Sequence, residues 1–445
     1  MAAARPMASD RRGREGRVRR RDRLRHAAMG GRALVGDPQA VTARSAEEVD
    51  AREVGLRRRD VAAIWEAVEG YYRTGLQPAL ALCVRHRGQV ILDRAIGYAR
   101  GGGPGDQGIE RVLATPQTLF NLFSASKSIT SMLIHLLVER GQVDLDAPVS
   151  RYIPGFERRG KGGITMRHVM AHRAGIPKTP TAHVDPELLS RPERIVELML
   201  DSRPETAPGQ RLAYTAVNGG FLMAEVVRQV TGQDVRSFLR QEIVEPLGFD
   251  ALNYGVGPER VGEVARESVT GPPPAFPFDN LLRRSLGIGL QEAVDLSNDP
   301  RFITGIVPAG NVYATANEAC RFFELLLRGG MLDGVRVFAP ETVRGAVAPQ
   351  NSWELDRTIG LPIRYGLGFM LGGQTMGFYG RGSAQAFGHL GFTNVLAYAD
   401  PERDISVALM NNGKPLVTPE LLLWLNITYT IAQRIPRVRG RIIQP

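Results

Sequence analysis

The stretch Ser124-Ala125-Ser126-Lys127 places a serine three residues before a lysine at the start of a predicted helix. Residues three apart lie one turn apart on the same helix face, so Ser124 Oγ and Lys127 Nζ can meet. A serine hydroxyl becomes nucleophilic when a base takes its proton, and a partly desolvated lysine loses proton affinity and can act as that base. The free N–H groups of a helix N-terminus suit a developing oxyanion. The stretch therefore predicts a nucleophilic serine.

The residues that follow predict an amphipathic helix that ends at Arg140-Gly141. Ser126 is a rival nucleophile, but Ile129 rather than a lysine stands three residues after it. The apolar positions fall on one face of a helical period. They are Ile129, Met132, Leu133, Leu136 and Leu137.

The four-residue motif has a second interpretation, which is a helix N-cap followed by a solvated lysine. Two distant segments favour the catalytic interpretation. One is Tyr214-Thr215-Ala216, and the other is Phe387-Gly388-His389-Leu390-Gly391-Phe392, late in the chain. The order Ser-x-x-Lys, then a tyrosine, then His-x-Gly is typical of the penicillin-recognising serine hydrolases.

With these motifs the chain resembles the serine β-lactamase superfamily, on the class C side that also includes DD-peptidases and family VIII carboxylesterases. The likeness runs from about residue 60 to residue 432. Further matching segments are Val143-Asp144-Leu145-Asp146-Ala147-Pro148-Val149, His168-Val169-Met170-Ala171-His172-Arg173-Ala174-Gly175, Glu245-Pro246-Leu247-Gly248, Pro308-Ala309-Gly310 and Tyr365-Gly366-Leu367-Gly368.

The resemblance implies an α+β fold of the β-lactamase/transpeptidase type, with an antiparallel sheet flanked by helices. It implies a discontinuous α/β domain over residues 51–145 and 306–445, and an inserted, mostly helical domain over residues 146–305. Periodicity and turn signals predict the individual elements. They indicate helices over 61–72, 317–328 and 421–432, and strands over 79–85, 90–98, 365–371, 394–399 and 405–410.

The resemblance also implies roles for the residues of the motifs. Ser124 is the nucleophile, and Lys127 and Tyr214 share its proton, with the order in which they act left open. His389 stands where the β-lactam-hydrolysing relatives have a lysine, and a neutral imidazole there can hydrogen-bond the tyrosine or the substrate. The oxyanion hole is expected from the backbone N–H groups of Ser124 and Phe392.

Four further residues are expected to bind the substrate. Ala216 takes the place of a common asparagine, whose amide faces the amide side chain of β-lactams, so its absence weakens recognition of such substrates. Gly391 is the glycine of the His-x-Gly segment, two residues after His389. Phe276 and Phe278 lie in a proline-rich loop that either forms a wall of the acyl pocket or is a plain surface loop.

These features predict a serine carboxylesterase that cleaves esters of short to medium acyl chains through an acyl-enzyme on Ser124. The substrate is a small-molecule ester, and the reaction needs no cofactor. Three alternatives stay open on the same scaffold. They are a β-lactamase or DD-peptidase-like hydrolase, a transacylase and a non-catalytic binding module.

The charge is concentrated in one segment. The chain of 445 residues carries +10, yet residues 1–32 hold eleven arginines against three carboxylates, so the rest is close to neutral. Residues 1–50 are expected to form a disordered, Arg-rich extension, and no nucleic-acid partner is expected. The extension lacks the apolar run of a secretory signal, and no segment is apolar enough to span a membrane.

The cysteine and histidine content predicts neither disulfides nor a metal site. Cys83 and Cys320 are the only cysteines, and we expect both to be buried and reduced, which with the missing signal favours a cytoplasmic protein. His168 and His172 lie four residues apart, but Val169 stands where the metalloprotease pattern needs a glutamate. We therefore expect both histidines to be structural.

Overall fold

The computed structural model describes residues 31–178, 185–273, 280, 282–283, 286–416 and 418–438. An eight-stranded antiparallel sheet forms the centre, in the order β1-β3-β2-β16-β15-β14-β13, with β4 pairing to β3. Its strands are β1 (Thr42–Arg44), β2 (Ala79–His86), β3 (Gln89–Arg100), β4 (Val112–Leu113), β13 (Met370–Leu371), β14 (Phe387–Gly391), β15 (Val395–Asp400) and β16 (Ile405–Asn411).

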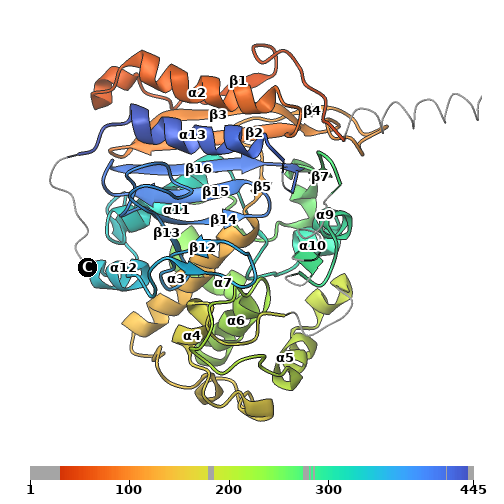
Figure 1. The fold of residues 1–445 in the computed structure, drawn as a ribbon, viewed down its shortest axis with the longest axis vertical. Coiled ribbons are helices and arrows are strands. Elements are labelled where there is room, and N and C mark those ends of the chain that lie inside the picture. The colour runs from red at the N-terminus through yellow and green to blue at the C-terminus, as the bar shows by residue number, and fades with distance from the viewer. Residues whose placement is uncertain are drawn as a thin grey trace, which may run out of the picture.

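Helices cover both faces of this sheet and extend beyond it (Figure 1). They are α2 (Arg58–Tyr72), α3 (Ser126–Glu139), α4 (Met166–Met170), α5 (Pro192–Asp201), α6 (Asn218–Thr231), α7 (Val235–Leu239), α9 (Leu290–Ser297), α10 (Pro300–Thr304), α11 (Ala316–Leu327), α12 (Pro340–Val347) and α13 (Leu421–Arg434). Shorter helical turns are η1 (Ala51–Val54), η2 (Phe123–Ala125), η3 (Val149–Arg151), η4 (Arg158–Gly160), η5 (Pro186–Ser190), η6 (Arg240–Val244) and η7 (Pro258–Glu263).

Four small strand groups connect the remaining segments. They are β5 (Phe120–Asn121) and β6 (Asn253–Tyr254) on either side of β8 (Val312–Ala314), the parallel pair β7 (Ser268–Val269) and β17 (Gly413–Lys414), β9 (Met331–Leu332) with β10 (Val335–Arg336), and β11 (Glu354–Leu355) with β12 (Pro362–Ile363). The β5-β8-β6 group brings the segment before Ser124 against the segment after Gly310.

The strand β2 shows why the sheet is buried on both faces. Leu80, Leu82 and Val84 point to the core under α2 and α13, whereas Ala81 and Cys83 point to the core around α3 and α11. Successive side chains of a strand alternate between faces, so an unbroken apolar run requires cover on both sides. The expected α+β fold with an antiparallel sheet flanked by helices is thus confirmed. Figure 1 shows α2 and α13 together on one face, and α4 to α7 beyond α3 on the other side.

The helix α3 is buried more completely than its pattern predicted. Every side chain from position 126 to position 137 is buried, including the polar ones. Ser128 Oγ donates to the Gly368 carbonyl at 3.0 Å, and Thr130 Oγ1 donates to the Pro308 carbonyl at 2.6 Å. The expectation of an amphipathic helix with a solvated face is therefore wrong, because hydroxyl groups that find carbonyl acceptors can be buried.

Two further expectations need correction. The Arg-rich extension was expected to reach residue 50, but Thr42–Arg44 form β1 and pair with β3, and Val41 is buried. Residues 1–30 lie outside the described residues. The strand expected over 365–371 is shorter, because only Met370–Leu371 form β13, after a turn in which Gly368 has φ +92°. The domain boundaries at residues 146 and 305 remain a prediction.

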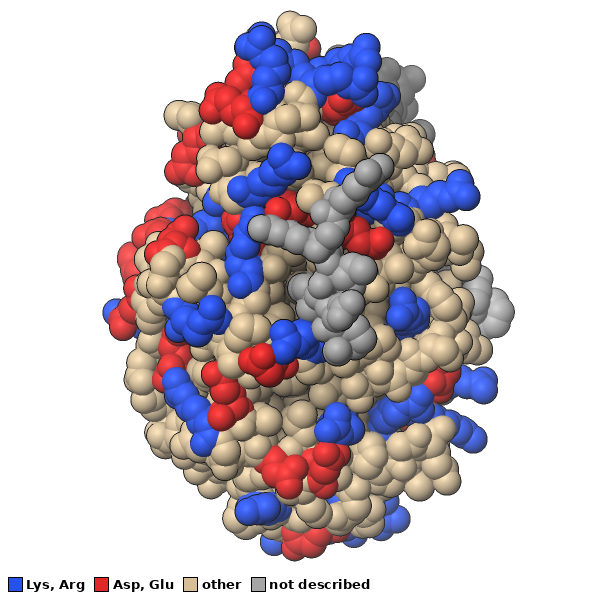
Figure 2. Space-filling model, turned by 90° about the vertical axis from the view of Figure 1, so that its left-hand side faces the viewer, with Lys and Arg blue, Asp and Glu red and all other residues tan. Residues whose placement is uncertain are grey.

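Both cysteines are buried, as expected. Cys83 and Cys320 are free and buried, and Cys320 Sγ lies 3.2 Å from Ser406 Oγ. On the face shown in Figure 2, basic and acidic side chains are interspersed rather than gathered by sign. Within the described ranges, no helix is long and apolar enough to cross a lipid bilayer.

Candidate active site

The nucleophile candidate Ser124 lies in the 3₁₀ turn η2, immediately before α3. Phe123 has φ +46°, which a residue with a side chain seldom adopts, and its N–H donates to Asn121 Oδ1 at 2.8 Å. Such backbone strain is often found at functional turns. The rival Ser126 is fully buried, and its Oγ accepts the Val312 N–H at 3.0 Å. Ser126 therefore joins α3 to β8, which leaves Ser124 as the partly exposed serine.

Lys127 reaches Ser124 as the helical spacing predicted. Its Nζ donates to Ser124 Oγ at 3.0 Å and to the Ala309 carbonyl at 3.1 Å. The side chain is only 3% exposed, and burial lowers the pKa of Lys127 to about 7. Desolvation penalises the charged ammonium, so a large fraction of the amine is neutral near pH 7. A neutral amine at this distance can accept the serine proton.

Tyr214 lies in the loop before α6, with its phenol against the Ser124 side chain. The ring centroid is 4.8 Å from Lys127 Nζ. Burial is the main cause that raises the pKa of Tyr214 above its usual value, and the nearby Asp356 charge adds to it. The phenol form is therefore favoured over the phenolate at neutral pH.

His389 lies on β14, fully buried, with its ring centroid 6.0 Å from that of Tyr214. Burial, helped by the Lys127 charge, lowers the pKa of His389 to about 3, so the imidazole is neutral. Its Nδ1 lies 2.6 Å from the Leu390 carbonyl, which assigns the ring proton to Nδ1 because a carbonyl can only accept. Its buried Nε2 is then an acceptor, and it has no hydrogen-bond partner among the described residues.

The end of β14 packs directly against the nucleophile turn. A Cβ at Gly391 would lie 2.4 Å from the Leu122 carbonyl oxygen, so only glycine permits this approach. The next residue, Phe392, packs edge-on against Phe123, with centroids 5.7 Å apart. Phe392, which the family resemblance implies as the second oxyanion donor, thereby lies against the turn that carries Ser124.

An apolar cavity of about 180 Å³ opens at Ser124. Ala216, an expected substrate-binding residue, and Phe392, an expected oxyanion donor, line it, whereas Gly391 is not among its lining residues. Phe276 and Phe278 lie outside the described residues. The other lining residues are mostly apolar and include Phe123, Leu188, Leu189, Ile195, Leu198, Met199, Val217, Phe221, Leu286, Ile288, Leu296, Phe302, Val307 and Ala309.

Two residues of the site, His172 and Asp356, were not predicted from the sequence. His172 is buried, its ring centroid lies 4.7 Å from that of Tyr214, and its Nδ1 accepts the Thr215 N–H at 3.2 Å. Burial lowers the pKa of His172 well below its usual value, so this ring is neutral too. Asp356 accepts the Tyr214 N–H at 3.1 Å and the Tyr365 hydroxyl at 3.1 Å. Together these side chains hold the loop that carries Tyr214.

The two histidines that were considered as metal ligands, His168 and His172, make structural contacts instead. His168 Nδ1 accepts the Thr165 N–H at 3.2 Å at the start of α4, whereas His172 packs on Tyr214. The described residues contain no group of three His, Cys, Asp or Glu side chains that could hold a metal ion. His172 lies in the segment over residues 168–175, which resembles the family, so the sequence held a signal for it. The loop that carries Asp356 contains no such motif.

Comparison with known proteins agrees with this geometry. The family model described as Beta-lactamase matches residues 66–430. The chain belongs to the beta-lactamase family. The resemblance derived from the Ser-x-x-Lys, Tyr and His-x-Gly segments is therefore confirmed, and the family places the chain among hydrolases of the serine β-lactamase superfamily.

Individual members of the beta-lactamase family are similar over most of the chain. The esterase/beta-lactamase LipL of Mycobacterium tuberculosis is 31% identical over 343 residues, which are 73% of this chain and 76% of LipL. A penicillin-binding protein homologue from Caulobacter crescentus has a TM-score of 0.73 at 26% identity, over 85% of this chain and 99% of its own. A family VIII carboxylesterase has a TM-score of 0.71 at 20% identity, over 84% of this chain and 98% of its own, which shows a shared fold.

Proposed function

We propose that this protein is a serine carboxylesterase that cleaves esters of short to medium acyl chains through an acyl-enzyme on Ser124. One observation carries the proposal. Ser124 Oγ lies 3.0 Å from the amine of Lys127, whose pKa is lowered to about 7, at the opening of an apolar cavity. A nucleophile, a base and an apolar acyl site thus meet at one place.

Acylation begins when the neutral Lys127 amine takes the Ser124 proton as Oγ attacks the ester carbonyl carbon. The carbonyl π electrons move to oxygen, where the backbone N–H groups of Ser124 and Phe392 stabilise the charge. The intermediate then expels the alcohol oxygen, which receives the proton from the Lys127 ammonium through the Tyr214 hydroxyl. The phenol against Ser124 suits this transfer because burial keeps it protonated.

Deacylation repeats these steps with water as the nucleophile. Water gives a proton to the Lys127–Tyr214 pair and attacks the acyl carbon, and Ser124 Oγ leaves and regains a proton. His389 Nε2, a buried acceptor without a partner among the described residues, takes a hydrogen bond from the Tyr214 hydroxyl or from the substrate. Its role in this scheme is to orient the hydroxyl rather than to carry a charge.

The walls of the site favour simple esters. An apolar cavity of about 150 Å³ is large enough to bind benzene, so about 180 Å³ suits an acyl group of about six carbons. The neutral His389 offers no fixed cation for a substrate carboxylate. Ala216 supplies no amide for a peptide or β-lactam side chain, and the amide nitrogen of Asn218, which also lines the cavity, already donates to the Ile176 and Lys178 carbonyls.

A β-lactamase activity is the second candidate, because the similar LipL is named both an esterase and a beta-lactamase. The two functions share the acyl-enzyme and differ in the leaving group. Hydrolysis of nitrocefin at a kcat/KM comparable to that of p-nitrophenyl butyrate would favour this second function.

The test combines two serine variants with covalent labelling. Ser124→Ala is expected to abolish hydrolysis of p-nitrophenyl butyrate, whereas Ser126→Ala retains it because Ser126 bonds to β8. A fluorophosphonate probe should label the wild-type protein at Ser124 and leave Ser124→Ala unlabelled, as mass spectrometry of peptides would show. Retained turnover in Ser124→Ala would show that Ser124 is not the nucleophile. A wild-type protein that is neither labelled nor active would indicate a binding module.

A further inference from the structure

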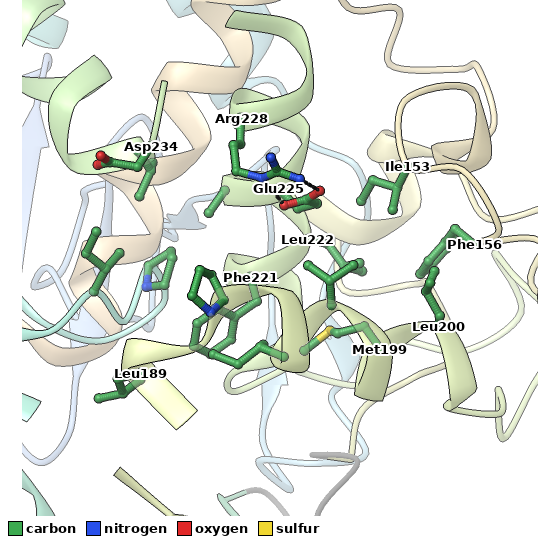
Figure 3. A pocket seen from close by; sticks show the side chains of 17 residues that line it. Ile153, Phe156, Leu189, Met199, Leu200, Phe221, Leu222, Glu225, Arg228 and Asp234 are labelled. Carbon is green, nitrogen blue, oxygen red and sulfur yellow. Dashed lines mark hydrogen bonds and ion pairs between the residues drawn. The ribbon is translucent and has the colours of Figure 1, made fainter. Parts of the chain in front are cut away.

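A second apolar cavity of about 140 Å³ lies between α5 and α6 (Figure 3). Figure 3 shows the side chains of Phe221, Leu222 and Met199 converging on it, with the Glu225–Arg228 pair nearby. Its apolar lining residues are Ile153, Phe156, Leu189, Pro192, Ile195, Val196, Met199, Leu200, Phe221, Leu222, Ala224, Val235, Ile306 and Pro308. The mechanism proposed above makes no use of this cavity.

The second cavity shares a wall with the cavity at Ser124. Four side chains line both spaces, namely Leu189, Ile195, Met199 and Phe221. At this wall the two cavities are therefore one residue apart. The methionine in this wall, Met199, has three rotatable side-chain bonds and adapts its shape readily. The side chains of the wall can therefore move apart without a change of fold.

The helix α6 runs along both cavities. Asn218, at its first turn, lines the cavity at Ser124, Phe221 lines both, and Ala224 and Arg228 line the second cavity. At a rise of about 1.5 Å per residue, the ten helical steps from Asn218 to Arg228 span about 15 Å. One helix thus lines both cavities and leads from the nucleophile to the second one.

The charged residues of the second cavity are bonded to one another or to backbone. Arg228 Nη2 donates to Glu225 Oε1 at 2.7 Å, and Gln229 donates to the same oxygen at 2.7 Å. Asp234 accepts the Arg236 and Ser237 N–H groups at the start of α7. These groups are already satisfied, so the cavity suits an uncharged hydrocarbon rather than an acid or a polar headgroup.

We infer that the second cavity binds the distal part of a long, unbranched acyl chain whose carbonyl carbon is attached to Ser124. The chain passes between Leu189 and Phe221 from the first cavity into the second. This inference rests on the proposed function and extends its substrates to esters of long-chain fatty acids. The first cavity alone accommodates about six carbons, so a longer chain needs the second cavity or must remain in water.

The expected signature is the dependence of kcat/KM on acyl length. Each buried methylene corresponds to about a fourfold preference, so losing the burial of two methylenes lowers kcat/KM about 15-fold. Wild-type protein is expected to cleave p-nitrophenyl laurate with a kcat/KM at least equal to that for the octanoate. A steep fall from octanoate to laurate in the wild type would overturn the inference without any variant.

Two matched variants on α5 test the location. Val196 lines the second cavity only, whereas Glu193 is exposed and lines neither. Val196→Phe fills the second cavity and should lower the laurate-to-butyrate ratio of kcat/KM about 15-fold. Glu193→Phe adds the same ring to the same helix on its outer side and should leave this ratio unchanged. Ala224→Leu, from α6, repeats the test if Val196→Phe fails to fold.

The outcomes separate the inference from the proposed function. If the wild type cleaves butyrate and the ratio is the same in Val196→Phe and Ala224→Leu, the second cavity is only a packing void and the inference fails. If neither ester is cleaved, or if Ser124→Ala remains active, the proposed function itself fails. Melting temperatures of each variant show that a changed ratio does not come from partial unfolding.

Discussion

The lowered pKa of Lys127 predicts the pH dependence of catalysis. Burial moves this pKa from 10.5 to about 7, a shift worth about 5 kcal/mol against the ammonium form. An ordinary lysine at pH 7 would be neutral in about one molecule in three thousand, whereas Lys127 is neutral in about half. The neutral amine is the active form, so kcat/KM rises with pH through about 7 and then reaches a plateau.

The assay is hydrolysis of p-nitrophenyl butyrate between pH 5 and pH 9, corrected for spontaneous hydrolysis. We expect kcat/KM at pH 6 to be about a tenth of the plateau and at pH 5 about a hundredth, because kcat/KM follows the free enzyme. His389 does not titrate in this range, since burial lowers its pKa to about 3, and burial also lowers the pKa of His172 well below its usual value. The rise of kcat/KM through pH 7 therefore reports the deprotonation of Lys127.

One other buried group near the site titrates at a similar pH. Burial raises the pKa of Glu267 to about 7, and Glu267 lies 3.0 Å from Lys414 Nζ, which in turn lies 4.6 Å from the Phe123 ring centroid. Glu267→Gln is the control and should keep the same midpoint. A profile that is flat from pH 5.5 to pH 8.5, or that rises only near pH 10, would refute Lys127 as the buried base.

Three further outcomes are expected. Tyr214→Phe lowers kcat for p-nitrophenyl butyrate by about 10²–10⁴ without changing the melting temperature, because only the proton-carrying hydroxyl is lost; near-normal turnover would reject this role. Asp356→Ala leaves the Tyr214 N–H and the Tyr365 hydroxyl without their acceptor, so urea denaturation should show a loss of about 2–6 kcal/mol. Deletion of residues 1–30 leaves the ester rate unchanged while keeping Arg32, which pairs with Glu420 at 2.8 Å; a lost rate would assign the segment a role in the site.

Local sequence patterns predicted those elements of the fold that depend on contacts between residues close together in the sequence. The helix expected over 317–328 is α11, and the strand expected over 405–410 is β16. Periodicity could not show that α3 is buried all round, because this depends on distant carbonyls such as that of Gly368. The family resemblance implied an antiparallel sheet but not the order of its strands, for which the sequence holds no local signal.

The same division holds for the active site. Ser124 and Lys127 were predictable as a pair because one helical turn joins them, and the structure brings Tyr214 and His389 to them. Asp356 was not predictable, because it contacts Tyr214 from a loop 142 residues further along the chain. Long-range contacts that hold a catalytic loop leave no periodic trace in a single sequence.

The pairing of β2 with β16 has a consequence for how the protein is made. Leu80 pairs with Asn411, so the N-terminal hairpin of β2 and β3 emerges from the ribosome long before its partner strand. At roughly 5–20 residues per second, β2 waits for tens of seconds with an open edge of unpaired backbone N–H and C=O groups. A nascent chain in this state is prone to aggregate, so slow translation or premature termination should make it depend on chaperones in the expression host.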